Sequence, residues 1–378
     1  MTALAALALA LQAAPVIRLE PASSSSSLYE RMGLQAVKNG PDRVLLGGFD
    51  YRTRTCLREV SLLSQSGVER ATKVRLAVGR NHFGAHSVGP DRVLVMGGYS
   101  EAFETLASVE CLNLRTGASG AWPWMPDPAE LFTSHRIGNR VAVIGGLVSQ
   151  GTTRTLSTIQ WIDLKTREAV RATEGLVTSR FGHASLVLRS GEVVIVGGKH
   201  VQSVDGRPEY SAVDSVEIWD PKLGKVRPGG KLTTPRDRPA LVELGNGKVL
   251  VIGGTSDTSK HASIELYDPS SGTSRVVVSM STARMAPMIL PVADQGVLIA
   301  GGWVDDPVAG RAIEYLDFAR NTCTVVGRAQ VTRAEAAMVW LSRNEFALVG
   351  GKDSFGDRNP HSYSFQLTER FRVVQPER

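Results

Sequence analysis

The chain of 378 residues is poor in the residues that build disulfide frameworks and metal sites. It has only three cysteines, Cys56, Cys111 and Cys323, which are widely spaced and form no CxxC pair. Neither a set of disulfides nor a cysteine-bound zinc is therefore indicated, and we expect small buried thiols. The seven histidines form no cluster with ligand spacing. The sequence predicts no metal site and no cofactor.

The chain also lacks a large excess of charge of either sign. The 43 Lys and Arg exceed the 37 Asp and Glu by a net charge of +6, and the basic residues are spread without a block or a basic helix. Because nucleic-acid binders concentrate their basic residues on one stripe, we do not expect nucleic acid as a partner. No segment reaches the length of a membrane span. We expect a monomer whose partner is a protein or an anionic or polar ligand.

The first residues differ in composition from the rest of the chain. Leu4 to Ala13 is an Ala/Leu run interrupted by Gln12, and the small residues that follow suit cleavage. This resembles the apolar region of a secretory signal, although Met1-Thr2 lacks the usual basic charge. We predict a signal peptide at residues 1–14 and export to the periplasm or the exterior. If the run is only a frayed tail, the protein is cytoplasmic.

Residues 15–27 contain the serine run Ser23 to Ser27. A serine run buries little area, so we predict a flexible linker here. Val16 to Leu19 could instead add an outer strand to the last structural unit.

A short apolar strand ending in Gly-Gly recurs seven times, about every 50 residues, a period typical of propellers and other repeat folds. The glycine pairs are Gly47-Gly48, Gly97-Gly98, Gly145-Gly146, Gly197-Gly198, Gly253-Gly254, Gly301-Gly302 and Gly350-Gly351. We expect close neighbours at each strand end, where a Cβ atom would not fit.

Three more strands accompany each glycine pair. A strand of small and apolar residues precedes it, as in 183–188, and an alternating strand closed by a turn follows it, as in 264–268. An outer strand such as 275–278 completes the unit. Seven four-stranded sheets arranged radially form a β-propeller.

These repeats resemble the kelch family from about Leu28 to Val374, on the glycine pairs, the downstream Glu and aromatic residue, and a recurring Arg. The first and third units are degenerate, and the last has Tyr363-Ser-Phe365 in place of its Glu/Asp strand. The resemblance implies an all-β, seven-bladed kelch-type propeller at residues 28–378. Kelch propellers serve as peptide-binding modules, sugar-active enzymes and scaffolds, so the fold leaves the function open.

An arginine lies seventeen residues before the first glycine of most pairs, where the innermost strand begins. We expect these residues to ring one mouth of the central channel, as an anion-binding rim or as loop anchors neutralised by Asp237, Glu335, Asp305 and Asp353. They are Arg80, Arg180, Arg236, Arg284 and Arg333, with Arg31 one residue nearer and no equivalent in the third unit.

The loops after the glycine pairs open on the same face and mix aromatic with charged residues, as protein-recognition surfaces do. The candidates for ligand binding there, beside the arginines, are Tyr51, Tyr99, Trp303, Asp305 and Lys352. The longest such loop, Lys199 to Asp214, is a candidate specificity element.

Catalytic motifs are absent from the sequence: it has no nucleophile elbow, HExxH or Walker loop, and we assign no catalytic residue. Copper radical oxidases share the fold, but the sequence shows no set of residues that matches their Cys–Tyr crosslink and their Tyr and His copper ligands. Sialic-acid mutarotases are exported kelch propellers acting on a carboxylate sugar, and only Glu335 is placed as their acid/base. We therefore predict an exported binding module, with a mutarotase-like epimerase or an intracellular kelch adaptor as alternatives.

Overall fold

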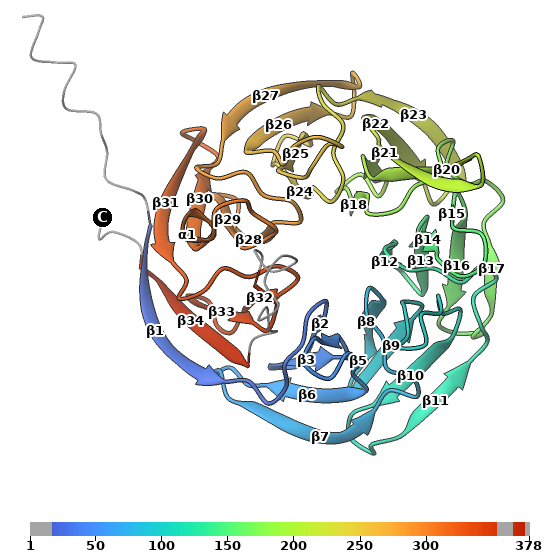
Figure 1. Cartoon of the computed structure of the whole chain (residues 1–378), viewed down its shortest axis with the longest axis horizontal. Coiled ribbons are helices and arrows are strands. Elements are labelled where there is room, and N and C mark those ends of the chain that lie inside the picture. Colours follow the sequence, from blue (N-terminus) through green and yellow to red (C-terminus); the bar gives the residue numbers. More distant parts are fainter. Residues whose placement is uncertain (1–16, 354–365, 375–378) are drawn as a thin grey trace, which may run out of the picture.

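The structure, a computed structural model, describes residues 17–353 and 366–374. Seven four-stranded antiparallel sheets surround a central channel, which confirms the predicted all-β, seven-bladed propeller (Figure 1). Among the described residues the one helix is the single turn α1 (Pro307–Gly310). The predicted signal peptide and the segment Tyr363–Phe365 lie outside the described residues.

The blades follow the chain, each running from its innermost to its outermost strand. Blade 1 contains β2 (Gln35–Asn39), β3 (Asp42–Leu46), β6 (Glu59–Leu63) and β7 (Glu69–Arg75). Blade 2 contains β8 (Gly84–Gly89), β9 (Arg92–Met96), β10 (Val109–Asn113) and β11 (Ser119–Trp122). Blade 3 contains β12 (Thr133–Ile137), β13 (Arg140–Ile144), β16 (Ile159–Asp163) and β17 (Ala169–Arg171).

The next three blades repeat the order. Blade 4 contains β18 (Ala184–Val187), β19 (Val193–Val196), β22 (Ser215–Asp220) and β23 (Lys225–Lys231). Blade 5 contains β24 (Ala240–Glu243), β25 (Val249–Ile252), β26 (Ser263–Asp268) and β27 (Thr273–Ser279). Blade 6 contains β28 (Met288–Val292), β29 (Gly296–Ala300), β30 (Ala312–Asp317) and β31 (Thr322–Arg328).

Blade 7 joins the two ends of the chain. It contains β32 (Ala337–Trp340), β33 (Glu345–Val349), β34 (Leu367–Val374) and, outermost, β1 (Arg18–Ser26). The serine run predicted as a flexible linker is thus mostly strand, and the alternative of an outer strand at Val16–Leu19 holds for Arg18 and Leu19, with the strand continuing to Ser26. The register runs from Arg18 opposite Val374 to Ser26 opposite Leu367. Backbone hydrogen bonds to β34 therefore stabilise β1, although its serine side chains bury little area.

The core lies between the blades. The second strand of every blade is a continuous apolar run, because neighbouring blades cover both of its faces. Val194 and Val196 of blade 4, for example, pack in one cluster with Val249, Val251 and Tyr267 of blade 5. Each blade thus completes the core of the next, and closure of the ring means that every blade has a neighbour on both sheet faces.

The glycine pairs lie where adjacent blades approach most closely. Gly253 and Gly254 have φ of +62° and +95°, and Gly254 N donates to Arg284 O of the next blade at 2.8 Å. A Cβ on Gly253 would lie 2.6 Å from that same oxygen. This confirms the predicted crowding at the strand ends.

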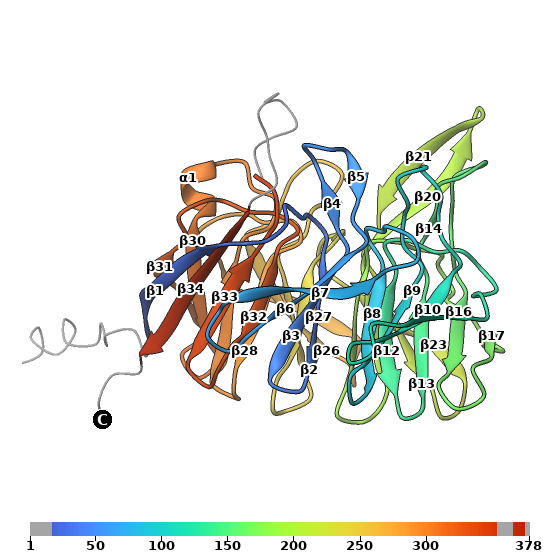
Figure 2. The same ribbon diagram turned by 90° about the horizontal axis from the view of Figure 1, so that it is seen from below.

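The two faces of the disc differ. One face, called here the hairpin face, carries β4 (Phe49–Asp50) with β5 (Thr55–Cys56), β14 (Leu147–Val148) with β15 (Arg154–Thr155), and β20 (Lys199–Val204) with β21 (Arg207–Ala212) (Figure 2). The opposite face, called the turn face, is formed by the turns between first and second strands and between third and fourth strands. The predicted Lys199–Asp214 loop is thus the β20–β21 hairpin, which projects above the hairpin face.

Candidate functional site

The six repeated arginines lie inside the blades and do not form an exposed rim. Their side chains are 0–1% exposed, and each forms an ion pair with a buried glutamate of its own blade. The pairs are Arg31–Glu69, Arg80–Glu110, Arg180–Glu217, Arg236–Glu265, Arg284–Glu314 and Arg333–Glu369. The expectation of an arginine-rimmed binding face is therefore corrected, and the alternative of structural pairing describes these residues.

Arg236 shows how each pair is built. Its Nη1 donates to Gly253 O at 2.6 Å and to Ser263 O at 3.0 Å, and its Nη2 lies 2.8 Å from Glu265 Oε1. Glu265 also accepts from Thr233 N at 2.8 Å, in the link from the preceding blade. Burial lowers the pKa of Arg236, and Glu265 opposes that change. The arginine thus connects the glycine pair at the end of the second strand to the third strand of the same blade. The glutamate connects both to the segment that enters from the preceding blade.

Three of the other candidates come together. Lys352 Nζ lies 4.0 Å from the ring centroid of Tyr51 and 4.9 Å from that of Trp303, and its side chain is fully buried. The two aromatic rings belong to blades 1 and 6 and the lysine to blade 7, so the cluster bridges three blades. A cation between two aromatic faces is a favourable contact in a water-poor setting.

Tyr99 and Asp305 lie apart from that cluster. Tyr99 contacts Phe103 edge-on with a centroid separation of 5.8 Å. Asp305 is largely exposed and pairs with Lys260 at 2.5 Å. The five non-arginine candidates therefore share the hairpin face without forming one site.

A ring of seven residues, one from each blade, surrounds the channel, and all have φ between +49° and +65°. This channel ring consists of Gly33, His82, Leu131, Gly182, Arg238, Ala286 and Glu335. Its members line a cavity of about 380 Å³. Backbone hydrogen bonds join neighbouring members, as from Arg238 N to Gly182 O at 2.8 Å and from Gly33 N to Glu335 O at 2.8 Å.

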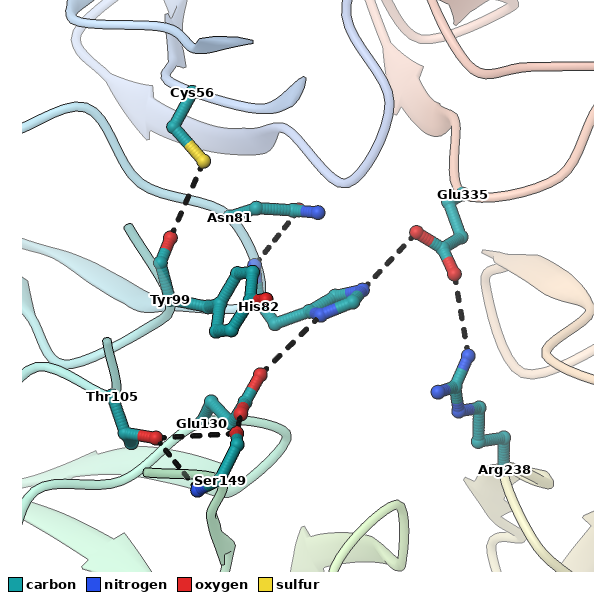
Figure 3. A network of polar contacts seen from close by, with 9 residues as sticks. All are labelled: Cys56, Asn81, His82, Tyr99, Thr105, Glu130, Ser149, Arg238 and Glu335. Carbon is teal, nitrogen blue, oxygen red and sulfur yellow. Dashed lines mark hydrogen bonds and ion pairs between the residues drawn. The ribbon is translucent and has the colours of Figure 1, made fainter. Parts of the chain in front are cut away.

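The charged members of the channel ring form one network (Figure 3). His82 Nε2 lies 3.2 Å from Glu335 Oε2 and its Nδ1 lies 3.9 Å from Glu130 Oε2. Glu335 Oε1 also pairs with Arg238 Nη1 at 3.2 Å. Glu130 accepts a short hydrogen bond from Ser149 Oγ of its own blade 3. Ser149 N donates in turn to Thr105 Oγ1 of blade 2 at 2.9 Å, so the network reaches the junction of blades 2 and 3.

The network fixes the charges of its members. Burial alone would lower the pKa of His82, but Glu335 and Glu130 raise it to about 9. Burial alone would raise the pKa of Glu335, but His82 and Arg238 lower it to about 2. A general acid or base works best with a pKa near the working pH. His82 and Glu335 therefore form an ion pair, and neither has a pKa near neutral pH.

Histidines of blades 2 and 3 bridge the inner strands of blades 2 to 4. His86 Nε2 lies 2.9 Å from Ser134 Oγ, and His135 Nε2 lies 2.7 Å from Ser185 Oγ. Burial lowers the pKa of both imidazoles to about 4, with a smaller contribution from neighbouring Arg136 and His86, respectively. The sequence shows only that the histidines form no cluster with ligand spacing, because pairing them with these serines requires the register between neighbouring blades.

Most of the exposed large apolar side chains of the hairpin face belong to loops and links of blades 2 to 4, whereas Leu28 lies on the link into blade 1 and Val308 on α1 of blade 6. Phe103 is 74% and Trp124 71% exposed, and both belong to the loops and links of blade 2. We call the following set the apolar arc, which runs over blades 2 to 4: Val78, Phe103, Trp124, Val177, Val204 and Tyr210. Sequence reasoning named Tyr99 in this region but did not find the arc, because exposure of linker residues depends on how the blades pack.

Comparison with known families agrees with this architecture. The kelch motif matches residues 238–281, which begin in the channel ring and run through blade 5 to the link after its outer strand. No curated protein matches the chain. Within the described residues no group of three or more His, Cys, Asp and Glu could hold a metal ion. In the same part of the chain no helix is long and apolar enough to cross a membrane.

Proposed function

Because the chain is a kelch-type β-propeller, a fold that commonly serves as a protein-interaction module, we propose that it binds a protein partner through the apolar arc of its hairpin face. The observation that carries the proposal is the presence of six exposed apolar side chains on the hairpin-face loops and links of three consecutive blades. Scattered exposed apolar residues need no explanation, whereas a group on one face is typical of an interaction site.

The surroundings of the arc suit protein recognition. Phe103 and Trp124 are large aromatic side chains, the type that dominates binding energy at interfaces. Exposed Glu101 and Glu104 flank Phe103, and Arg154 lies on the hairpin of blade 3. An apolar centre with a charged rim is the usual composition of a protein interface.

The rigid propeller would present the arc with little loss of entropy. Ala212 N donates to the Asp257 carboxylate of blade 5 at 3.0 Å, which anchors the base of the β20–β21 hairpin. Tyr210 on that hairpin lies edge-on to Phe181, with a centroid separation of 6.1 Å. A fixed hairpin reduces the ordering cost of binding.

A photo-crosslinking amino acid tests the proposal in the native host. We expect a protein adduct from positions 103 and 124 and none from position 223, because Leu223 is equally exposed, at 73%, but lies on the turn face. With the partner purified, the double substitution Phe103→Ser and Trp124→Ser should weaken binding at least about tenfold. Equal adducts from all three positions, or unchanged affinity, would contradict the proposal.

We also propose that the protein is exported, on the basis of the apolar run Leu4–Ala13 and the small residues after it. The partner would then be a periplasmic or extracellular protein. Retention in the cytoplasm would instead favour the adaptor alternative.

A further inference from the structure

A second cavity lies on the turn face, at the seam where the ring closes. Its volume is about 610 Å³, within the range of small-molecule sites. Its walls come from the turns of blades 1, 6 and 7 and from Val373 of β34. We call it the seam pocket. It lies on the face opposite the apolar arc, so it is independent of the proposed protein interface.

The lining of the seam pocket is positively charged. Lys38, Arg43 and Arg343 contribute side chains to it, and its described lining contains no carboxylate. Three acidic residues adjoin the lining in sequence, and each pairs with a cation outside it: Asp42 with Arg70 at 3.2 Å, Asp294 with Arg189 at 3.2 Å, and Glu345 with Arg370 at 2.7 Å. Over the described part of the chain, none of the three lining cations forms an ion pair.

Other cavities on the turn face provide an internal comparison. The cavity between blades 1 and 2, about 580 Å³, sets Asp42 and Asp91 against Arg115. The cavity between blades 4 and 5, about 450 Å³, is lined by three acidic residues, Glu192, Glu243 and Asp268, and by three basic ones, Arg189, Arg227 and Lys248. Of these three grooves, one balances its charges and one has an excess of negative charge, whereas the seam pocket has an excess of positive charge.

The seam pocket also has a fixed aromatic wall. Trp340 Nε1 donates to Pro291 O of blade 6 at 3.0 Å, and its ring contacts Phe346 edge-on with a centroid separation of 6.0 Å. Pro41, Val292 and Leu341 add apolar surface. A tryptophan held by a hydrogen bond and a core contact needs little reordering to receive a ligand.

We infer that the seam pocket binds a small organic anion with a flat apolar body. The phosphate or carboxylate group is held by Lys38, Arg43 and Arg343, because guanidinium groups match these anions in charge and in planar geometry. The apolar body lies against Trp340 and the neighbouring prolines. Lys38 and Arg43 are direct partners across β2 and β3, so their side chains share one face of the sheet, and Arg343 comes from the turn of blade 7.

Phenyl phosphate, benzoate, inorganic phosphate and benzyl alcohol are suitable probes for the full chain. Calorimetry and the indole N–H resonance of Trp340 would report binding, with the resonance assigned by Trp340→Phe. We expect saturable binding of phenyl phosphate or benzoate, at least about tenfold tighter than inorganic phosphate or benzyl alcohol, and weakened by salt. The tighter of the two aryl anions identifies phosphate or carboxylate as the preferred group. No saturable binding of either aryl anion, or affinity no higher than that of inorganic phosphate, would overturn the inference.

Two exposed cations allow a test that leaves the fold intact. Lys38→Gln with Arg343→Gln should weaken aryl-anion binding at least about tenfold, since each lost charged contact contributes to the affinity. Arg115→Gln, on the same face but in the cavity between blades 1 and 2, should leave it unchanged. Equal affinity in the double variant, or an equal loss in the Arg115 control at unchanged melting temperature, would mean that the anion binds elsewhere. Protein crosslinking at the apolar arc should be unaffected by either variant.

Discussion

In the third blade, Ala129 occupies the place of the buried arginine and Gln160 the place of its glutamate. The backbone shows the equivalence. Ala129 O accepts a hydrogen bond from Gly98 N of the preceding blade at 2.8 Å, and in the other blades the backbone oxygen of the arginine accepts the same bond from the second glycine of the preceding pair. Gln160 Oε1 accepts from Asp127 N at 2.8 Å, which keeps the bond to the inter-blade link. Both charges are lost together, so no buried charge is left unpaired.

Blade 1 shows the same rule in another form. Ser61 stands at the third-strand position of the glutamate, and the carboxylate comes from Glu69 on the outer strand, 3.5 Å from Arg31. The requirement that a buried arginine has a carboxylate partner is met in every blade that carries one. Charge neutrality inside the blade is therefore the constraint, and the strand that supplies the carboxylate varies.

Replacement of Arg236 by alanine tests this structural role. We expect Arg236→Ala to lower the free energy of unfolding by about 3–5 kcal/mol, because Glu265 is left buried and unpaired. Chemical denaturation of the purified protein measures the change. The matched control is Lys231→Ala, which breaks the exposed pair with Asp214 and should cost less than about 1 kcal/mol. Equal losses in the two variants would contradict a special role for the buried pair.

The period, the number of blades and the crowding at the glycine pairs were predictable from sequence, because each repeats locally. The place of the arginines was not. A position at the start of the inner strand does not tell whether the side chain enters the channel or the blade. Glu110 and most of its equivalents lie on the third strand of a blade, whereas the arginines precede the first strand. To pair them from sequence, one would have to know how the three strands align in the sheet.

The channel network shows a second limit. His82 and Glu335 meet only because blade 7 returns to blade 1, and no local pattern joins residues so distant in sequence. The serine strand β1 shows a third limit: its propensity is poor, but the open edge of β34 supplies its hydrogen bonds. Ring closure, a property of the whole chain, decides both features.

The histidines of blades 2 and 3 predict loss of stability in acid. The folded pKa values of His86 and His135 are about 4, below the value of 6.5 for an unperturbed imidazole. Between these values the unfolded state binds more protons, so stability falls as pH drops from about 6.5 to about 4. The midpoint of urea unfolding, measured across that range, should decrease. In the variant His135→Gln the decrease should be smaller, and an unchanged slope would exclude His135 as a contributor.

Export predicts a shortened chain in the native host. The signal prediction places cleavage near Ala14 or Pro15, before the described residues begin at Ile17. Intact-mass measurement of the protein purified from its host should therefore give a mature N-terminus at one of these residues. As a control, Leu9→Arg should interrupt the apolar run and leave the full-length chain in the cytoplasm. A full-length soluble chain in the wild type would contradict export and favour the adaptor alternative.

His82 should remain charged well above neutral pH. Its pKa is raised to about 9 because, although burial opposes the charge, Glu335 and Glu130 stabilise it. The stabilisation from this charge is fully present below the unfolded pKa of about 6.5 and is lost as pH rises through about 9. The ¹⁵N shifts of the His82 imidazole, followed from pH 6 to 10, measure the titration directly. Glu335→Gln removes the closer carboxylate and leaves Glu130 at 3.9 Å, so the midpoint should fall toward that of an ordinary histidine. The variant should also lose the stability difference between pH 7 and pH 9.5 that the wild type shows. A His82 midpoint near 6.5 in the wild type would mean that the ion pair at the channel ring does not form in solution.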